Sequence, residues 1–362
     1  MIFLTVIAFL FSLSFLIFLH EFFHFILAKK LKVKVEEFCI GLPPRIFSKK
    51  IGETIYSIGL LPLGGFNKLY GEEKREKKPG SFWGKRVEER FLIVFSAPLA
   101  NFLFGAFLFS IVFTLGFPQI IEKKPPLNAK EISIQVIQVM RDSPADKAGI
   151  FLGDKIIALK AKKEEIKNIK EIEEIQKFIE KHKGEKIELT LKRGEKMIKK
   201  VVIARKNPPK GEGPLGIALA KTAIVSYPFP EAIIKGGEYC LKISETLFLV
   251  LGKMIKGLFT GEKIQGVEIV GPIGIGVLIS QMISQGSIYF LHFLGLLSVN
   301  LALFNLLPLP ALDGGKIMLL FLEKIRKKPL SERAENLINQ IGIGFLIFLM
   351  IIVTIKDLIR LF

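Results

Sequence analysis

The sequence predicts an α-helical polytopic membrane protein with about four transmembrane helices, a membrane-associated β-element and an inserted extracytoplasmic α+β domain. Half of its 362 residues are hydrophobic, and a mean hydropathy of +0.43 fits neither an ordinary soluble domain nor a wholly embedded transporter. The apolar residues gather in four runs that are long enough to cross a bilayer as helices. Basic residues gather at the ends of these runs, and a long charged region separates the second run from the third.

The four apolar runs are about Ile2–Ala28, Phe91–Gly116, Ile288–Leu307 and Ile341–Ile355. The first run could pass for a signal peptide, but it lacks a basic n-region and a small-residue cleavage site, so we expect a retained helix. The third should continue to a Leu-Asp-Gly motif, and the fourth should follow a cytoplasmic loop. The predicted membrane segments are therefore 1–28, 91–116, 288–315 and the later part of 316–362.

Basic residues beside the spans predict the orientation of the chain, because cytoplasmic loops are enriched in Lys and Arg. They place residues 29–90 inside, and both termini and the region 117–287 outside. Because the basic residues behind the net charge of +18 cluster at the span ends and in one charged middle region, they favour anionic lipid and argue against nucleic acid as a partner. Cys39 and Cys240 then lie on opposite sides, which excludes a disulfide between them. The basic residues concerned are Lys29, Lys30, Lys32, Lys34, Lys85, Arg86, Arg90, Lys324, Arg326, Lys327 and Lys328.

Residues 29–90 are predicted to form the membrane-associated β-element. Within them, Val33–Phe66 has the pattern of short strands, because Gly41-Leu42-Pro43-Pro44, Gly52 and Gly64-Gly65 interrupt it. Irregular backbone near a membrane is tolerated only where protein or a watery cavity satisfies its polar groups. Such an element would also offer an edge that can pair with an extended substrate.

The charged region carries a pattern of its own at residues 128–205. Ser143–Ile157 predicts a short helix, a glycine turn and a strand. The pattern resembles a bacterial PDZ domain, which would bind peptides or substrate termini between a strand and a helix. A generic small α+β domain is the alternative. The further predicted elements are a helix at about Ile169–Lys181 and strands at about Lys186–Leu191 and Met197–Ala204.

Two stretches around this domain are predicted to face water or the membrane surface. The Lys- and Glu-rich run Lys160–Lys183 indicates a solvated helix face. Residues 206–287 are predicted to form a linker, marked by Asn207-Pro208-Pro209, followed by an interfacial amphipathic helix at about Glu238–Gly257. Charged side chains interrupt that helix, so it is not counted as a fifth span.

The most informative motif is His20-Glu21-Phe22-Phe23-His24, because it lies inside the first apolar run. Acidic and basic groups at membrane depth cost roughly 2.5–3.5 kcal/mol each on translocon scales, so their presence indicates function. One helical turn separates His20 from His24, so both imidazoles can bind one metal ion while Glu21 acts as a base. In a soluble helix the same short pattern would as readily be surface decoration, but the apolar setting favours the metal site.

Asp313 is the expected third metal ligand. It is the only carboxylate between Glu268 and Glu323, and it follows prolines that end the third span. Its depth matches that of the two histidines, since all three lie toward the cytoplasmic side. The competing His292 would lie about 30 Å away along a helix that rises 1.5 Å per residue, and we expect it to be interfacial or packed. His182 is expected to be exposed.

Two imidazoles, one carboxylate and a water make the open tetrahedral site of catalytic Zn²⁺. The ion would polarise the scissile carbonyl and lower the pKa of its water, while Glu21 takes the proton and later gives it to the leaving amine. Two roles stay open for Asn305. It can bind the substrate backbone or an oxyanion, or it can satisfy backbone groups freed at Pro308.

These residues together resemble the site-2 protease family of intramembrane zinc metalloproteases, specifically its bacterial RseP-like (regulator of sigma-E protease) branch with one PDZ domain. The matching segments occur in the family's order and cover almost the whole chain. Some relatives have two PDZ domains, whereas this sequence shows one. The matching segments are the histidine motif, Gly64–Phe66, Ala97–Asn101, Ser143–Ile157, Gly271–Ile275 and Asn305–Gly315.

The resemblance implies a zinc endopeptidase of the bacterial cytoplasmic (inner) membrane that cleaves single-span membrane proteins within or near the bilayer. An anti-sigma factor and remnant signal peptides are the substrate classes that the family suggests. The PDZ-like domain would either exclude untrimmed substrates or bind a new C-terminus. The main alternative is an inactive membrane scaffold that displays a PDZ domain, and a metal transporter or sensor is a second. The residues concerned are His20, His24 and Asp313 for zinc, Glu21 for acid/base catalysis, and Asn305, Gly64, Gly65 and Phe66 for substrate.

Overall fold

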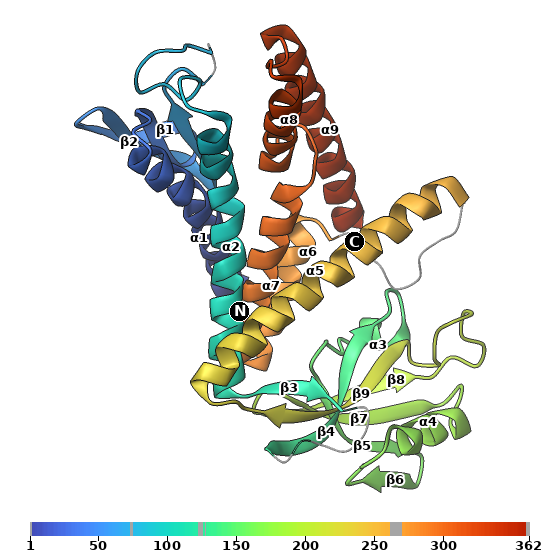
Figure 1. The fold of residues 1–362 in the computed structure, drawn as a ribbon. Helices are drawn as coiled ribbons and strands as arrows, with labels where there is room; N and C mark the ends of the chain where they lie inside the picture. Colours follow the sequence, from blue (N-terminus) through green and yellow to red (C-terminus); the bar gives the residue numbers. More distant parts are fainter. Residues whose placement is uncertain (1, 73–74, 122–125, 127, 261–269, 360–362) are drawn as a thin grey trace.

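The computed structural model describes residues 2–72, 75–121, 126, 128–260 and 270–359 (Figure 1). Helices form a bundle, and a separate β-structure lies at each of its two ends. A small two-stranded sheet lies beside the C-terminal end of the first helix, and a larger sheet lies at the opposite end. Parts of the predicted segments 1–28, 29–90, 117–287 and 316–362 fall outside the described residues.

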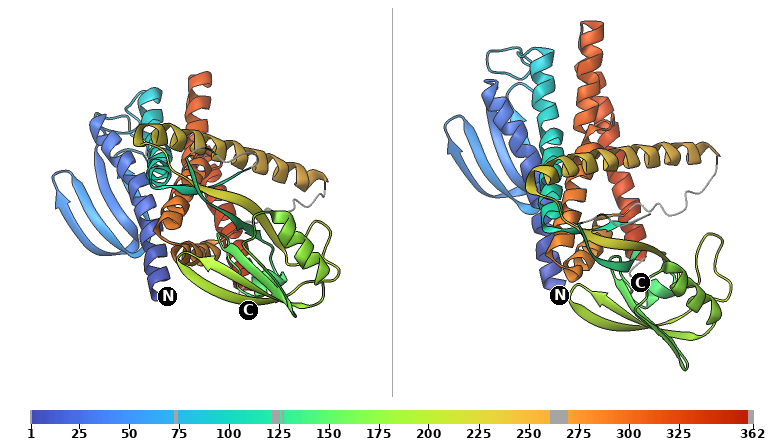
Figure 2. Two further views of the ribbon diagram at one scale, coloured as in Figure 1. Left: turned by 90° about the horizontal axis from the view of Figure 1, so that it is seen from below. Right: turned by 60° about the horizontal axis from the view of Figure 1, so that its bottom comes forward.

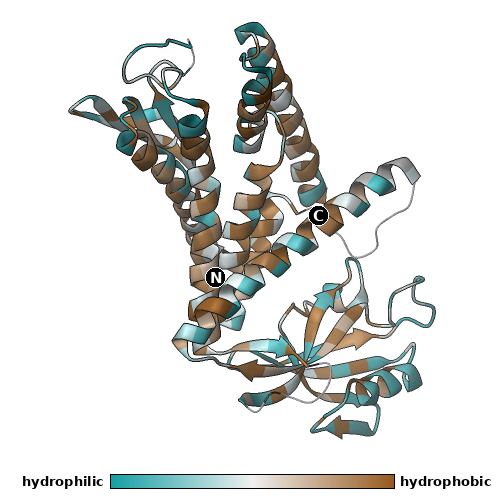
Figure 3. Ribbon diagram, viewed as in Figure 1, coloured by the Kyte–Doolittle hydropathy of each residue, from teal (hydrophilic) through white to brown (hydrophobic). Residues whose placement is uncertain are grey.

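Four helices among the described residues are long and apolar enough to cross a membrane, which agrees with the predicted number of spans. Figure 3 shows hydrophobic residues along these helices and hydrophilic residues toward the ends of the bundle. The last helix begins well before the predicted apolar run. Its first turns are polar, so they did not belong to the apolar run from which the span was predicted. The four are α1 (Ile2–Lys30), α2 (Val87–Leu115), α7 (Ser287–Leu306) and α9 (Glu332–Ile359).

The spans connect at alternating ends of the bundle (Figures 1 and 2). The N-terminus of α1 and the larger sheet share one end, whereas residues 31–72, residues 75–86 and helix α8 (Asp313–Arg326) share the other. The predicted topology requires this separation, because it assigns these segments to opposite sides of the membrane. Which side each end faces stays a prediction.

Helix α2 is the centre of the bundle. Half of the residues in its most apolar stretch are buried, whereas the corresponding fraction is 17% in α1, 33% in α7 and 11% in α9. Glycines let α2 and α7 approach closely, as small residues do at helix interfaces in membranes. A Cβ atom added to Gly105 would lie 2.5 Å from Val299 Cγ2, and one added to Gly295 would lie 2.9 Å from Phe109 Cε1. These two contacts leave no room for a larger side chain at either glycine.

Strands β1 (Val35–Ile51) and β2 (Thr54–Leu69) form the small antiparallel sheet, within the region predicted to be a β-element. Their register is irregular, and Phe38 of β1 pairs with both Tyr56 and Asn67 of β2. The start of β1 therefore lies between the two halves of β2. This arrangement makes the second half of β2 an edge of the sheet, and β2 also packs against α1.

The larger sheet and its two helices form a second unit, here called the sheet domain (117–225). Its strands are antiparallel in the order β3-β9-β4-β5-β7-β8, with β6 paired to β5. An apolar core that includes Leu159, Ile175 and Leu189 fills the space between the sheet and its helices. The elements are β3 (Phe117–Ile120), β4 (Ala129–Val139), α3 (Pro144–Lys147), β5 (Lys155–Ala161), β6 (Glu164–Lys167), α4 (Ile172–Lys181), β7 (Lys186–Arg193), β8 (Lys196–Ile203) and β9 (Ile217–Val225).

The predicted domain 128–205 is too short, because β9 lies inside the sheet between β3 and β4. The Pro- and Gly-containing stretch after residue 205 predicted a linker, but the chain turns there and returns to the sheet. This pairing joins residues far apart in sequence, such as Val136 and Leu219, so local patterns do not reveal it. The predicted solvated helix Lys160–Lys183 is also wrong in its first part, which forms the β5–β6 hairpin.

Two helices occupy stretches that the sequence assigned to a linker and a loop. Helix α6 (Pro272–Gln285) lies in the predicted linker region and packs against α1, α7 and α9. The Asp357 carboxylate of α9 accepts a hydrogen bond of 2.9 Å from the Gly274 N–H, which fixes the start of α6. Helix α8 occupies the predicted cytoplasmic loop. The predicted amphipathic helix lies within the longer α5 (Phe229–Thr260), which packs against α2.

Gln285, at the end of α6, joins the sheet domain to the bundle. Its buried side chain donates to Leu152 O and to Asp154 Oδ1, both at 3.0 Å. Its own oxygen accepts from the Gly194 N–H at 3.2 Å. All three partners lie in the sheet domain, so this glutamine helps to hold that domain against the α6–α7 turn.

We predict that Gly105→Leu destabilises the bundle by about 1–3 kcal/mol, because overpacking forces α2 and α7 apart. Gly344→Leu is the matched control, since an added Cβ meets nothing within 4 Å there. Thermal unfolding of the detergent-solubilised variants measures the difference. Equal melting temperatures for the two variants would contradict the proposed packing.

Candidate metal centre

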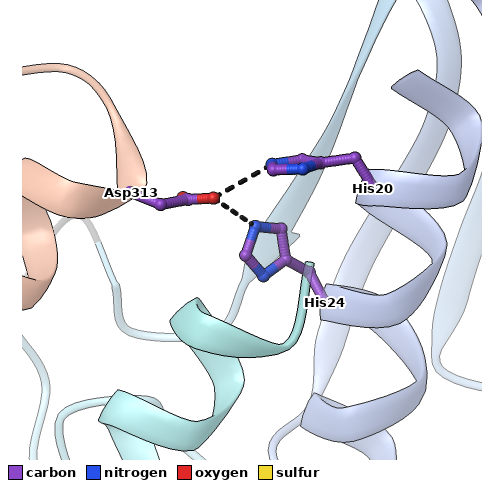
Figure 4. A group of neighbouring side chains, drawn as sticks. All are labelled: His20, His24 and Asp313. Atoms are coloured by element: carbon purple, nitrogen blue, oxygen red, sulfur yellow. Dashed lines mark ion pairs between the residues drawn. The ribbon is translucent and has the colours of Figure 1, made fainter. Parts of the chain in front are cut away.

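The structure brings three of the sequence-predicted residues to one point (Figure 4). His20 and His24 project from successive turns of α1, and Asp313 faces them from the start of α8. Asp313 Oδ2 lies 3.0 Å from His20 Nε2 and 3.3 Å from His24 Nε2. One ligand atom from each residue lies within 4.8 Å of the others, a spacing that suits a shared metal ion.

The break between α7 and α8 delivers Asp313 to this point. Proline residues follow the end of α7 and cannot continue a helix, so the chain turns before α8 begins. The turn is tight, since a Cβ added to Gly314 would lie 2.2 Å from Leu307 O, and one added to Gly315 would lie 2.3 Å from Leu309 O. The two glycines therefore permit the close turn that directs Asp313 toward α1.

A backbone carbonyl fixes the tautomer of His24. Its Nδ1 lies 2.9 Å from Ile93 O of α2, and a carbonyl oxygen can only accept a hydrogen bond. Nδ1 of His24 therefore carries a proton and donates it. This leaves Nε2 of the neutral ring with a lone pair that points toward Asp313, as metal-binding histidines require.

Asn101 plays the same part for His20. His20 Nδ1 lies 3.5 Å from Nδ2 of the Asn101 side chain, which is fully buried. The Asn101 side-chain oxygen has no partner among the described residues. Turning that oxygen toward the imidazole lets His20 Nδ1–H donate to it and satisfies both groups. His20 Nε2 then also presents a lone pair to Asp313.

These residues fit a cation. With both Nδ1 atoms protonated, two Nε2 lone pairs face Asp313 Oδ2, which is buried and has no hydrogen-bond donor among the described residues. Three acceptors that face one another in a buried site are unfavourable unless a positive charge lies between them. Two nitrogens and one oxygen leave the fourth position of a tetrahedral zinc site open.

A cavity of about 280 Å³ opens beside this group. It is large enough for several water molecules or part of a peptide, and Glu21 lies on its wall. Two residues predicted to handle substrate, Asn305 and Phe66, also line it. Gly65 lies next to the cavity, because a Cβ added there would be 3.2 Å from Glu21 Cγ, whereas the corresponding position on Gly64 meets Leu42.

Comparison with known proteins also points to a metal-dependent peptidase. The sequence profile of peptidase family M50 matches residues 8–349. The chain belongs to this family. The family match and the four apolar helices identify a polytopic membrane protein and confirm the predicted metalloendopeptidase and the resemblance to site-2 proteases. The one-PDZ branch stays a prediction.

Relatives of this M50 peptidase match it over nearly their whole length. A protein of Clostridium perfringens is 33% identical, with 97% of each chain covered, and one of Clostridium acetobutylicum is 31% identical, with 99% of this chain and 98% of the relative covered. The names of both contain the words zinc metalloprotease. A protein of Bacillus licheniformis named zinc metalloprotease RasP is 27% identical, with 99% of each chain covered. These names agree with the predicted cofactor, Zn²⁺.

The two other histidines lie elsewhere. His292 stacks on Phe117 with ring centroids 4.1 Å apart, and its Nε2 lies 3.1 Å from the Tyr239 hydroxyl. It was expected to be either interfacial or packed, and these contacts show that it is packed. His182 was expected to be exposed, and this is wrong: only 6% of it is accessible. Glu164 and Glu185 hold its ring at the end of α4, a tertiary arrangement that the charged sequence did not reveal.

Sequence reasoning missed polar residues of the M50 site that the fold brings to the cavity. Lys316, one turn after Asp313 on α8, lines it, and its ammonium lies 2.8 Å from Glu72 Oε1. The charge of Glu72 holds the pKa of Lys316 above its ordinary value. The spacing of three residues after Asp313 was the available signal for Lys316. Asn67, which also lines the cavity, directly follows the Gly64–Phe66 segment.

We predict that His24→Ala and Asp313→Ala purify without zinc, because two ligands alone bind the ion poorly. Asn101→Leu should keep the site but lower its zinc affinity about 10–100-fold, as loss of a ligand-orienting partner does. His182→Gln in the sheet domain is the control and should bind like wild type. Elemental analysis and zinc titration of the purified proteins measure this; full zinc in Asp313→Ala would remove Asp313 from the site.

Proposed function

We propose that this M50 peptidase is a zinc-dependent endopeptidase of the bacterial cytoplasmic membrane that cleaves single-span membrane proteins within or near the bilayer. The observation that carries the proposal is the convergence of His20, His24 and Asp313 beside a cavity that Glu21 lines. Both histidines lie in a helix apolar enough to span a membrane. A peptide bond cleaved there belongs to a segment at membrane depth.

The roles of the residues follow from their chemistry. His20, His24 and Asp313 would hold Zn²⁺, which when bound supplies a Lewis acid for the scissile carbonyl and for water. Glu21 takes a proton from the attacking water and passes it to the leaving amine, as a positioned carboxylate can. Asn305 faces the same cavity and is available to bind the substrate backbone or an oxyanion.

The second half of β2 is the proposed docking edge for substrate. A peptide bond in a helix is shielded by its own backbone hydrogen bonds, so a membrane substrate must unwind before cleavage. An edge strand offers backbone groups that can pair with the extended segment. The edge that includes Gly65 and Phe66 runs beside Glu21, so pairing there would bring the substrate to the cavity.

The sheet domain is proposed to be extracytoplasmic and PDZ-like. β4 covers one side of β9 along its length, but β3 covers the other side only from Thr222 to Val225. The first half of β9 thus keeps a side without a strand partner among the described pairings, near α4. A strand and a helix so arranged can take a peptide or a substrate terminus. Either recruitment or exclusion of untrimmed substrates is consistent with this position.

We predict that Glu21→Gln abolishes cleavage while zinc stays bound, because the amide keeps the shape but cannot take a proton. The loss should be at least about 10²-fold, the lower range for acid–base catalysis. Co-expression with a set of tagged single-span proteins, followed by a search for fragments, measures it. Glu53→Gln, which changes a carboxylate in the β1–β2 turn bonded to Lys34, is the control. Full activity of Glu21→Gln would rule out this role of Glu21, whereas the absence of fragments even with wild type would favour the inactive scaffold.

The topology gives a separate prediction. An impermeant thiol reagent should label a cysteine placed at Lys170, in the sheet domain, but not one placed at Lys77 in intact cells. Both native cysteines, Cys39 and Cys240, are buried and should give little background. Permeabilised cells should allow labelling at Lys77 and so show that the site is reactive. The reverse pattern would place the sheet domain in the cytoplasm.

A further inference from the structure

We propose that Asn67 is a positioning residue that holds Glu21 in the orientation needed for proton transfer. The inference deepens the proposed function and rests on it, since it assumes that Glu21 is the base. Asn67 Nδ2 donates two hydrogen bonds of 2.7 Å, one to Glu21 Oε2 and one to the Glu21 backbone carbonyl. One side chain of β2 thus binds both the carboxylate and the main chain of one residue of α1.

The strand places Asn67 where this contact is unavoidable. Side chains alternate along a strand, so positions 65 and 67 face the same side. At position 65 the backbone of β2 comes so close to α1 that a Cβ would lie 3.2 Å from Glu21 Cγ. Glycine at 65 permits this approach, and the asparagine two residues later reaches the carboxylate from the same face.

The hydrogen-bonding groups fix which amide atom faces Glu21. The backbone carbonyl and the carboxylate oxygens of Glu21 both accept hydrogen bonds. The NH₂ group of Asn67, which donates, must therefore point at them. The Asn67 oxygen is buried and has no partner among the described residues. Both hydrogen bonds of the Asn67 side chain among the described residues therefore end on Glu21, and this contact accounts for the orientation of Asn67.

The arrangement has a consequence for catalysis. A glutamate side chain has several rotamers, and only some direct a carboxylate oxygen at a water beside the metal ligands. Asn67 occupies Oε2 and leaves Oε1 for the proton. Because Asn67 lies in the edge strand proposed to pair with substrate, the same backbone that aligns the substrate also aligns the base. A misplaced base slows the chemical step without weakening substrate binding.

The test uses the zinc-loaded full-length protein and a single-span protein that wild type cleaves in the co-expression screen. Asn67→Leu has similar size but no donor, and Asn67→Asp keeps the shape but offers only acceptors. We expect both to lower kcat about 10–100-fold, the usual loss for an orienting partner, with KM and zinc content close to wild type. Glu53→Gln, in the β1–β2 turn away from the docking edge, is the control and should match wild type.

Binding gives a readout without turnover. Acetohydroxamate binds a catalytic zinc ion through its oxygens and can donate a hydrogen bond to the neighbouring carboxylate. If Asn67 acts through Glu21, Asn67→Leu should weaken this binding in the wild-type background and have no further effect in Glu21→Gln. An equal effect in both backgrounds would show that Asn67 acts independently of Glu21 and would overturn the inference.

The remaining outcomes separate the two proposals. Wild-type kinetics in Asn67→Leu, together with an inactive Glu21→Gln, would overturn the role of Asn67 and leave the proposed function standing. Loss of zinc or a raised KM in both Asn67 variants would show a structural role and also overturn it. Full activity in Glu21→Gln would overturn the proposed role of Glu21 and the inference with it, and the absence of any cleavage by wild type would overturn the proposed function.

Discussion

Three lone pairs that face one point inside an apolar helix bundle are the constraint on which this structure depends. His20 Nε2, His24 Nε2 and Asp313 Oδ2 all accept, and none of the described residues offers a donor between them. In water such groups would be hydrated separately at little cost. In a buried site they require a cation, and their neighbours hold them ready for one. The donor set and the open fourth position are those of a catalytic zinc peptidase, which agrees with membership of family M50.

Helix α2 makes this arrangement rigid. Its carbonyl at Ile93 accepts from His24, its Asn101 side chain faces His20, and its Gly105 lets α7 approach. The same helix thus orients both imidazoles on α1 and fixes the helix whose end leads to Asp313. Glycines 314 and 315 complete the link by allowing a turn too tight for larger residues. The geometry of the proposed ligands therefore depends on the packing of the bundle, because a shift of α2 would move all three ligands relative to one another.

The two β-structures lie at opposite ends of the bundle and differ in how they can act on the site. The edge of β2 touches α1 at Glu21 through Gly65 and Asn67, so it acts at contact distance. The sheet domain lies at the far end and is joined to the bundle through Gln285 at the α6–α7 turn. That domain can influence cleavage through access to the bundle or through the helices that it contacts or continues into, which are α2, α5, α6 and α7. In the proposed function, substrate alignment and substrate admission are thereby separated in space.

The sequence by itself determined the features that local pattern and depth specify. Long apolar runs predicted the four candidate spans, a four-residue spacing put His20 and His24 on one helix face, and depth along the spans favoured Asp313 over His292. Only the tertiary structure decided which distant residues meet them. The place of β9 in the sheet and the contacts of Asn67 and Asn101 with the site join residues tens of positions apart. Helical and strand periodicities report on neighbours two to four residues away, whereas these contacts arise from packing between elements, which no local pattern encodes.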